Sequence, residues 1–172
     1  MKNKKLENDV QLNNELRSSL SKNEDEITPV TIVNIYGGKK NKIIKKEGLK
    51  VLLDTGCCTS IAKEKHCQNK KRNKVSNYAT GGGALKTKYE SEIHFALPEF
   101  SDKKIIKWNF NITSSDDLGY DMIIGRDILM TLGINFSFVN KTVEWEGISI
   151  PMRDFNKIKK YKLSKYEIKA II

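Results

Sequence analysis

Short apolar segments, each closed by turn residues, constrain the fold of this chain more than any other feature. They are rich in β-branched residues, and several alternate apolar and polar positions as half-buried strands do. Many short strands without long intervening helices are typical of an all-β sandwich or barrel. The segments predicted as strands are Val30–Tyr36, Ile43–Ile44, Leu49–Leu53, Ile61–Ala62, Val75–Tyr78, Leu85–Leu97, Ile105–Ile112, Tyr120–Ile124, Ile134–Phe138, Thr142–Trp145 and Ile148–Pro151.

One short helix is expected among these strands. Asp127–Leu132 has the only convincing helical pattern. Gly133 follows it in the position where glycine commonly ends a helix. The fold class predicted from the pattern alone is therefore all-β with one short helix.

Composition divides the 172 residues into three parts. Residues 1–28 are polar, and although Leu12, Leu16 and Leu20 have helical spacing, no partner face follows them, so we expect a flexible N-terminal arm. Residues 29–153 contain all the strand-like segments and form the expected domain. Residues 154–172 are a basic C-terminal tail whose apolar positions are too sparse to predict a core.

The net charge of +10 is concentrated in three lysine-rich segments, residues 39–50, 63–74 and 155–172, each with six basic residues and one Glu. Such segments can bind nucleic acid, and they equally form ordinary solvated surfaces. No aromatic residues alternate with the lysines of the first two segments as single-strand binding surfaces require, and the third segment has Tyr161 and Tyr166 among its lysines. Nucleic-acid association is therefore a weakly supported alternative.

Two further features bear on location and redox state. No segment reaches the roughly 18 apolar residues of a membrane span, and Met1–Lys5 is charged with no apolar stretch behind it. We therefore expect an intracellular, cytoplasmic protein that does not associate with a membrane. Cys57, Cys58 and Cys67 are an odd number of cysteines with two adjacent, which is a poor disulfide framework.

The segment most suggestive of chemistry is Leu52–Gly56, which reads Leu-Leu-Asp-Thr-Gly. A carboxylate directly after an apolar strand is poorly solvated, and its charge is costly unless it is shared, paired or hydrogen-bonded. Thr55 supplies a hydroxyl, and Gly56 lets backbone approach a ligand closely. Taken alone, the tripeptide also fits an ordinary turn at a strand end.

Two later segments extend this motif. Asn77–Tyr89 contains Gly81, Gly82 and Gly83 and is predicted as a hairpin whose mobile tip closes over a bound peptide. It lacks the Gly-Lys-Ser/Thr ending and the following helix of a phosphate-binding loop. Asp121–Leu129 then gives a strand, a glycine turn and the short helix.

These motifs in series resemble the retropepsins, and most closely the proteases of Ty3/gypsy-like retrotransposon polyproteins. The resemblance spans roughly residues 29–153. It implies a closed retropepsin-like β barrel with a flap hairpin and one short helix. It also implies a homodimeric aspartic endopeptidase that needs no cofactor or metal and cleaves a retroelement polyprotein.

The resemblance assigns roles to individual residues. Asp54 would be the catalytic carboxylate, Thr55 would make hydroxyl contacts across the dimer, and Gly56 would bond the substrate backbone. The other assigned residues are Leu52 and Ile123 in substrate pockets, Gly81, Gly82 and Gly83 at the flap tip, and Gly125, Arg126 and Asp127 as braces of the catalytic loop.

One position departs from the family pattern. Many retroviral members place an acidic residue two positions after the glycine, where it pairs with the arginine of the Gly-Arg motif. Here that position is Cys58. We therefore expect Arg126 to bind Asp127 or a backbone carbonyl instead.

The chain has a single Asp-Thr-Gly motif. Hydrolysis of a peptide by carboxylates alone needs two of them sharing one proton, and the pair titrates as a unit with an optimum in mild acid. The second carboxylate must then come from an isologous partner chain. This predicts a homodimer with one Asp54 from each copy.

Other functions were weighed against this one. A Cys–His peptidase built from these cysteines with His66 or His94 has no evident orienting residue, and a zinc site at Cys58, His66 and Cys67 lacks a regular fourth ligand. A domesticated or inactive copy would keep the fold as a binding or dimerisation module. The intact Asp54–Gly56 motif argues against that alternative.

Overall fold

The computed structural model describes residues 27–37, 42–43, 48–80, 83–101, 103–116, 118–154, 158 and 170–171. Most of the predicted N-terminal arm therefore lies outside the described residues, as does most of the predicted C-terminal tail. Gly81 and Gly82 of the predicted flap tip also lie outside them.

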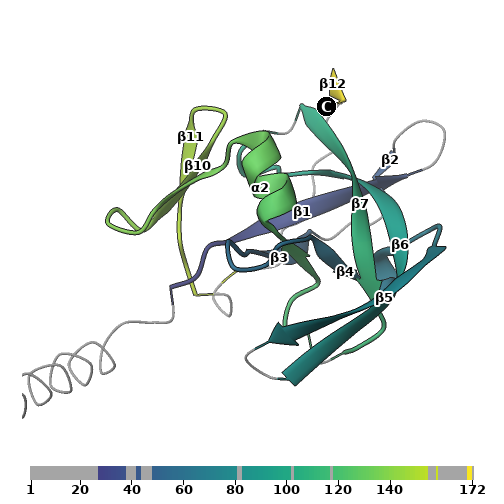
Figure 1. The fold of residues 1–172 in the computed structure, drawn as a ribbon. Helices are drawn as coiled ribbons and strands as arrows, with labels where there is room; N and C mark the ends of the chain where they lie inside the picture. Colours follow the sequence, from purple (N-terminus) through teal and green to yellow (C-terminus); the bar gives the residue numbers. More distant parts are fainter. Residues whose placement is uncertain are drawn as a thin grey trace, which may run out of the picture.

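Six strands close into a barrel (Figure 1). Their order is β7, β4, β8, β3, β1 and β6, and the pairing of β6 with β7 closes the ring. Their bounds are Val30–Gly37 for β1, Leu49–Leu53 for β3, Ile61–Lys63 for β4, Gly83–Ala96 for β6, Lys104–Thr113 for β7 and Met122–Ile124 for β8. The short strand β2, Lys42–Ile43, pairs with β1 outside the ring. The predicted all-β barrel is confirmed.

Large apolar side chains fill the barrel because strand residues point alternately inward and outward. In β3 the buried and half-buried positions alternate strictly, whereas β1 is buried along almost its whole length. Phe95 on β6 and Phe110 on β7 are fully buried and meet edge to face with ring centroids 5.5 Å apart. This geometry adds about 0.5–1.5 kcal/mol beyond simple burial, and it fixes β6 against β7.

A long hairpin extends from the barrel. Its strands are β5, Lys71–Thr80, and the first half of β6, and Figure 1 shows them projecting at the bottom of the view. The sequence predicted a strand only over Val75–Tyr78. The strand begins earlier, at Lys71, because Lys71 and Arg72 pair with residues of β6.

The helix α2 spans Arg126–Leu132 and lies beside a small second sheet (Figure 1). Gly133 ends it with φ at 68°, and the Ile134 amide donates to the Leu129 carbonyl at 2.9 Å. This is the glycine end predicted from the sequence. The second sheet has the order β11-β10-β9, with β9 at Asn135–Ser137, β10 at Thr142–Trp145 and β11 at Ile148–Pro151.

A short 3-10 helix, η1, covers Glu64–His66 and was not predicted. Three residues give no periodicity, and the surrounding lysines resemble a loop. Within the described part of the chain, no helix is both long and apolar enough to cross a membrane.

Both ends of the predicted domain are held by contacts. Thr28 and Arg153 form an antiparallel bridge. Beyond it, Ile158 is only 6% exposed and packs in a cluster with Val30 and Ile32. Strand β12, Ala170–Ile171, pairs in parallel with β7. Parts of residues 154–172 therefore lie against the barrel, although their spacing in the sequence did not suggest it.

Candidate active site

Asp54 follows the last residue of β3 and is held by backbone on both sides. Its amide donates to the Ile124 carbonyl of β8 at 2.9 Å, and the Gly56 amide donates to Asp54 Oδ1 at 2.8 Å. Asp54 is half-buried, whereas Thr55 and Gly56 are exposed. Among the described residues, no basic side chain forms an ion pair with Asp54. The Asp54 carboxylate is therefore oriented by the backbone amide of Gly56.

Gly125 is the point where the second motif meets the loop after Asp54. A Cβ at this position would lie 2.7 Å from the carbonyl carbon and oxygen of Thr59 and 2.8 Å from the Cys57 oxygen. Real Cβ atoms do not approach backbone so closely, so only glycine fits here. The Gly125 amide donates to Ser60 Oγ at 2.9 Å. The two predicted motifs are thus in direct contact.

Asp127 anchors the same loop from the first turn of α2. Its Oδ1 accepts from Ser60 Oγ at 2.7 Å, and its Oδ2 accepts from the Ser60 amide at 3.1 Å and from Trp108 Nε1 at 3.0 Å. A negative charge is also favoured at this end of a helix. Ser60 and Trp108 were not predicted as site residues. The one indication that could have pointed to them is general: a buried hydroxyl and an indole N–H each need a hydrogen-bond partner.

The predicted partner of Arg126 is wrong. Its Nη2 donates to Cys58 Sγ at 2.9 Å, while the Asp127 carboxylate is occupied by Ser60 and Trp108. The Arg126 amide donates to the Cys57 carbonyl at 2.8 Å. Cys58 therefore contacts the arginine from the very position where retroviral members carry an acid.

A small apolar cluster lies between the hairpin and the barrel wall next to Asp54. It contains both predicted pocket residues, since Ile123 is buried in it and Leu52 is packed against it. The remaining members are Ile61, Leu85 and Leu118, with Cys57 and Tyr78 partly buried. Leu85 and Tyr78 come from the hairpin, so its inner face contributes to the apolar surface beside the carboxylate. Gly83 begins β6 at the end of this hairpin.

The hairpin is also tied to the loop after Asp54 by a hydrogen bond. The Thr59 hydroxyl donates to the Tyr78 hydroxyl oxygen at 3.2 Å. Tyr78 therefore contributes an apolar ring to the cluster and a polar contact to the loop. No pattern in the sequence indicated that these two residues meet.

Two of the cysteine thiols, Cys57 and Cys67, have raised pKa values. Burial raises the pKa of Cys57, and the negative charges of Asp54 and Asp127 raise it further against the effect of a backbone hydrogen bond from Thr59. Burial raises the pKa of Cys67 to about 11. Because the thiolate is the nucleophile and the metal ligand, a raised pKa disfavours a Cys–His peptidase built on Cys57 or on Cys67. In the described part of the chain, no three His, Cys, Asp or Glu side chains are grouped to hold a metal ion.

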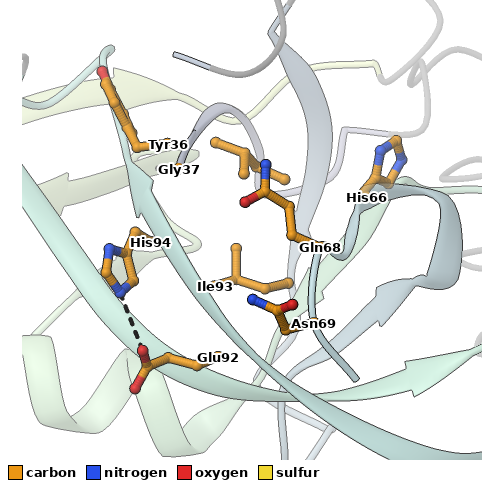
Figure 2. A pocket seen from close by; sticks show the side chains of 9 residues that line it. Tyr36, Gly37, His66, Gln68, Asn69, Glu92, Ile93 and His94 are labelled. Carbon is orange, nitrogen blue, oxygen red and sulfur yellow. Dashed lines mark hydrogen bonds and ion pairs between the residues drawn. The ribbon is translucent and has the colours of Figure 1, made fainter. Parts of the chain in front are cut away.

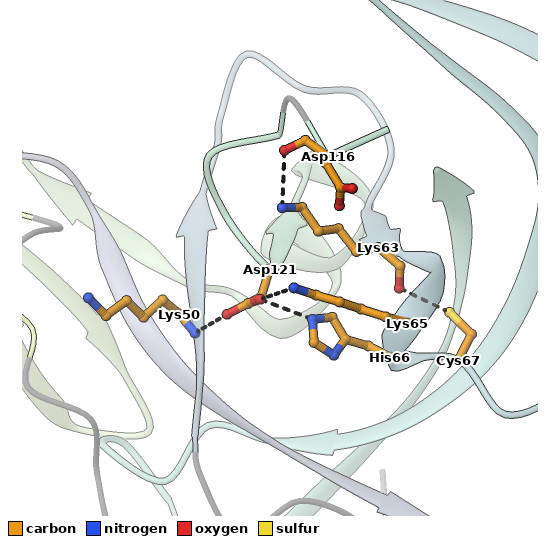
Figure 3. Close-up of polar contacts among 7 residues, drawn as sticks. All are labelled: Lys50, Lys63, Lys65, His66, Cys67, Asp116 and Asp121. Atoms are coloured by element: carbon orange, nitrogen blue, oxygen red, sulfur yellow. Dashed lines mark hydrogen bonds and ion pairs between the residues drawn. The ribbon is translucent and has the colours of Figure 1, made fainter. Parts of the chain in front are cut away.

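His66 belongs to a structural ion pair that Figure 3 shows. Its Nε2 lies 3.0 Å from Asp121 Oδ1, the Lys50 amide donates to Asp121 Oδ2 at 3.2 Å, and Lys65 Nζ lies 3.6 Å from Oδ1. The His66 hydrogen bond lowers the pKa of Asp121 to about 2 against the opposing effect of burial. The pair joins η1 to β3 and to the residue before β8.

A polar hollow elsewhere on the barrel contains none of the predicted site residues (Figure 2). His94 Nε2 lies 3.2 Å from Glu92 Oε1 at its edge. The hollow is lined by Ile35, Tyr36, Gly37, His66, Gln68, Asn69, Glu92, Ile93 and His94. We therefore locate the candidate active site at the loop after Asp54 and the apolar cluster, and not at this hollow.

Comparison with solved structures gives the fold a name. The retroviral protease-like domain of Ddi1 from Leishmania major is similar with a TM-score of 0.50 and 16% identity, over 77% of this chain and 98% of that domain. The EIAV protease complexed with the inhibitor HBY-793 is similar with a TM-score of 0.45 and 25% identity, over 66% of this chain and 95% of that protease. No protein-family model and no curated protein matches the sequence. The chain has a retropepsin-like fold, as the sequence predicted.

Proposed function

We propose that this chain is an aspartic endopeptidase that is active as a homodimer, with Asp54 of each copy forming the catalytic pair. The observation that carries the proposal is the state of Asp54. Its Oδ1 is oriented by the Gly56 amide at 2.8 Å, and no basic side chain of the described residues neutralises it. A half-buried carboxylate of this kind is suited to share a proton with a second one.

The proposed reaction uses the two carboxyl groups as base and acid. One carboxylate takes a proton from water as the water oxygen attacks the peptide carbonyl carbon, and the protonated carboxyl gives its proton to the carbonyl oxygen. The tetrahedral intermediate then collapses, the C–N bond breaks, and a proton passes to the leaving nitrogen. The products are a carboxylic acid and an amine, and the pair again holds one proton.

The surroundings of Asp54 suit a peptide substrate. Leu52 and Ile123 supply apolar surface on the barrel side, and Leu85 and Tyr78 supply it on the hairpin side. A peptide lying between them would have its side chains in apolar surroundings and its backbone near Gly56. The hairpin would act as the flap, with Gly81, Gly82 and Gly83 proposed at its tip.

The substrate class is part of the proposal. The motif series that resembles Ty3/gypsy-type retrotransposon proteases supports a retroelement polyprotein as substrate, including the precursor from which this chain would be released. Arg126 and Asp127 are proposed to brace the loop through the contacts they make with Cys57, Cys58 and Ser60.

A peptide-library digest in mild acid tests this function. We expect cleavage by the purified chain, inhibition by pepstatin, and loss of activity by several orders of magnitude in Asp54→Asn. Asp116→Asn is the matched control, because it makes the same chemical change at an exposed aspartate. Activity of Asp54→Asn within about tenfold of wild type would exclude the mechanism. A folded, dimeric wild-type chain that cleaves nothing would favour the inactive binding module.

A further inference from the structure

The β5–β6 hairpin carries a dense and unbalanced positive charge. Between Gln68 and Tyr89 the sequence has six basic residues and no Asp or Glu. All six are exposed: Lys70, Lys71, Arg72, Lys74, Lys86 and Lys88. Positive charges gathered on one surface produce a positive potential, and this potential attracts a polyanion.

Few of these charges are neutralised within the chain. Lys70 pairs with Glu64. Glu90, which lies opposite Lys71, accepts a hydrogen bond from Asn73 Nδ2 at 3.1 Å. None of the other five basic side chains forms an ion pair with a described residue. Most of the positive charge is therefore available to a ligand.

A bulge gathers these residues on one part of the hairpin. Arg72 pairs with Tyr89 and Ser76 pairs with Thr87, so residues 73–75 face the single residue Lys88. A bulge strengthens the local twist and aims side chains outward. Lys74 is therefore one of the three residues opposite Lys88, next to the Arg72–Tyr89 pair.

Tyr89 adds an exposed aromatic ring to the basic cluster. It is 39% exposed, and the ammonium of Lys70 lies 5.4 Å from its ring centroid. In the sequence Tyr89 is far from Arg72, and strand pairing brings them side by side. The expectation that no aromatic residue lies among the lysines is therefore wrong for this surface. Basic groups around an exposed aromatic ring are the combination that binds single-stranded nucleic acid.

The exposed basic residues are spread over both faces of the hairpin stem. Lys71 pairs with Glu90 and the next residue, Arg72, pairs with Tyr89, so Lys71 and Arg72 point to opposite faces. Along β6, Leu85 and Thr87 are buried, whereas Lys86 and Lys88 are exposed. Contacts made through the exposed residues would leave the buried Leu85 of the apolar cluster in place.

We propose that the β5–β6 hairpin binds single-stranded nucleic acid around its basic stem, with Lys71, Arg72, Lys74 and Lys88 contacting phosphates and Tyr89 stacking on a base. Strand β5 has ten residues and spans about 33 Å, which is long enough for several consecutive nucleotides. An acidic peptide would satisfy the charges but would not use the aromatic ring. This binding surface does not depend on the proposed peptidase activity.

The first test is charge removal measured by fluorescence anisotropy with labelled oligouridine. The variant Lys71→Gln/Arg72→Gln/Lys74→Gln should bind at least about tenfold more weakly, and its log–log salt slope should fall by about 2, since each phosphate contact on a single strand contributes about 0.7. The matched control Lys103→Gln/Lys107→Gln/Lys141→Gln removes the same charge from exposed positions outside the hairpin and should bind within about threefold of wild type. Equal weakening of both variants would overturn the proposal, because binding would then follow net charge alone.

The second test separates base stacking from charge. Tyr89→Leu should weaken oligouridine binding about tenfold and leave heparin binding unchanged, while Tyr89→Phe keeps the ring and should bind oligouridine like wild type. Circular dichroism melts establish that each variant is folded. Two results would also overturn the proposal. The first is binding of poly-glutamate as tight as that of oligouridine, and the second is a folded Tyr89→Leu variant that binds oligouridine like wild type.

Discussion

Asp54 depends for its position on residues that carry no chemistry of their own. Ser60 is fully buried, and its hydroxyl links the Gly125 amide to the Asp127 carboxylate. Removing that hydroxyl leaves a buried amide without an acceptor, which costs more than the hydrogen bond itself. The geometry of the loop at the candidate active site therefore depends on the buried hydrogen bonds of the Ser60 hydroxyl.

Ser60→Ala tests these hydrogen bonds. We expect the variant to lose about 1–3 kcal/mol of unfolding free energy in urea, because the Gly125 amide becomes unsatisfied. Ser149→Ala, at an exposed position of β11, is the control and should change stability by less than about 0.5 kcal/mol. Equal stability of the two variants would show that the Ser60 hydroxyl does not support the loop.

The Asp121 carboxylate predicts how stability depends on pH. Its pKa falls from 3.8 to about 2 on folding, chiefly through the His66 hydrogen bond. A lowered pKa stabilises the fold above pH 4, and this contribution is lost as the pH falls from about 4 to about 2. Asp121→Asn should therefore be less stable than wild type by about 2 kcal/mol near pH 6. The difference should close over that acid range, measured by urea unfolding at each pH.

Asp116→Asn serves as the control for this titration. Its side chain is exposed, and only its backbone carbonyl is contacted, by Lys63. We expect the difference in unfolding free energy between Asp116→Asn and wild type to stay constant as the pH falls. If the corresponding difference for Asp121→Asn is the same at pH 2 as at pH 6, the ion pair does not stabilise the fold.

At the scale of elements, the β5–β6 hairpin is the part that the proposed function uses as a flap. Its inner face joins the apolar cluster, and the Thr59–Tyr78 hydrogen bond of 3.2 Å ties it to the loop after Asp54. A flap must detach from that loop to admit a peptide and return to exclude water. The hydrogen bond is therefore expected to bias the hairpin toward its closed position.

Tyr78→Phe tests that bias because it removes the hydroxyl and keeps the ring. One hydrogen bond is worth about 1 kcal/mol, so we expect amide hydrogen exchange over residues 83–88 to become about fivefold faster. The melting temperature should change little, since the apolar cluster is kept. Tyr89→Phe is the matched control on the same hairpin. Unchanged exchange in Tyr78→Phe would show that the contact does not hold the flap.

The elements that the sequence predicted are those whose pattern is local. Leu49–Leu53 alternates cleanly, and Gly133 ends α2 by a local hydrogen-bond motif. The first half of β5 and the strand β12 exist through pairing with distant strands, and no local pattern reveals such pairing. The Cys58–Arg126 contact was missed for the same reason. A thiol is a weaker acceptor than the carboxylate that was expected to bind the guanidinium.

At the scale of the whole molecule, the two ends of the predicted barrel domain lie side by side. Thr28 bridges to Arg153, and Ile158 covers Val30 and Ile32. The domain proposed from the sequence, residues 29–153, leaves Ile158 outside its boundary. We propose that the boundary lies further along the chain, because Ile158 packs in one cluster with Val30 and Ile32 of β1.

Truncation after Arg153 measures that boundary. Loss of the buried Ile158 side chain should lower the unfolding free energy by about 1.5–3 kcal/mol. Removal of residues 1–26, which belong to the predicted flexible arm of residues 1–28, is the control and should leave the unfolding free energy unchanged. Equal stability of the full chain and the chain ending at Arg153 would favour the shorter domain.

The two-chain site can be tested by titrating Asp54→Asn into wild type at constant total concentration, under conditions where chains exchange freely and dimers predominate. Asp116→Asn is added in place of Asp54→Asn as the control. If each site needs Asp54 from both copies, activity follows the square of the wild-type fraction, and an equal mixture with Asp54→Asn retains about a quarter of the activity. Retention of about half would mean that each chain acts independently, and would contradict the account.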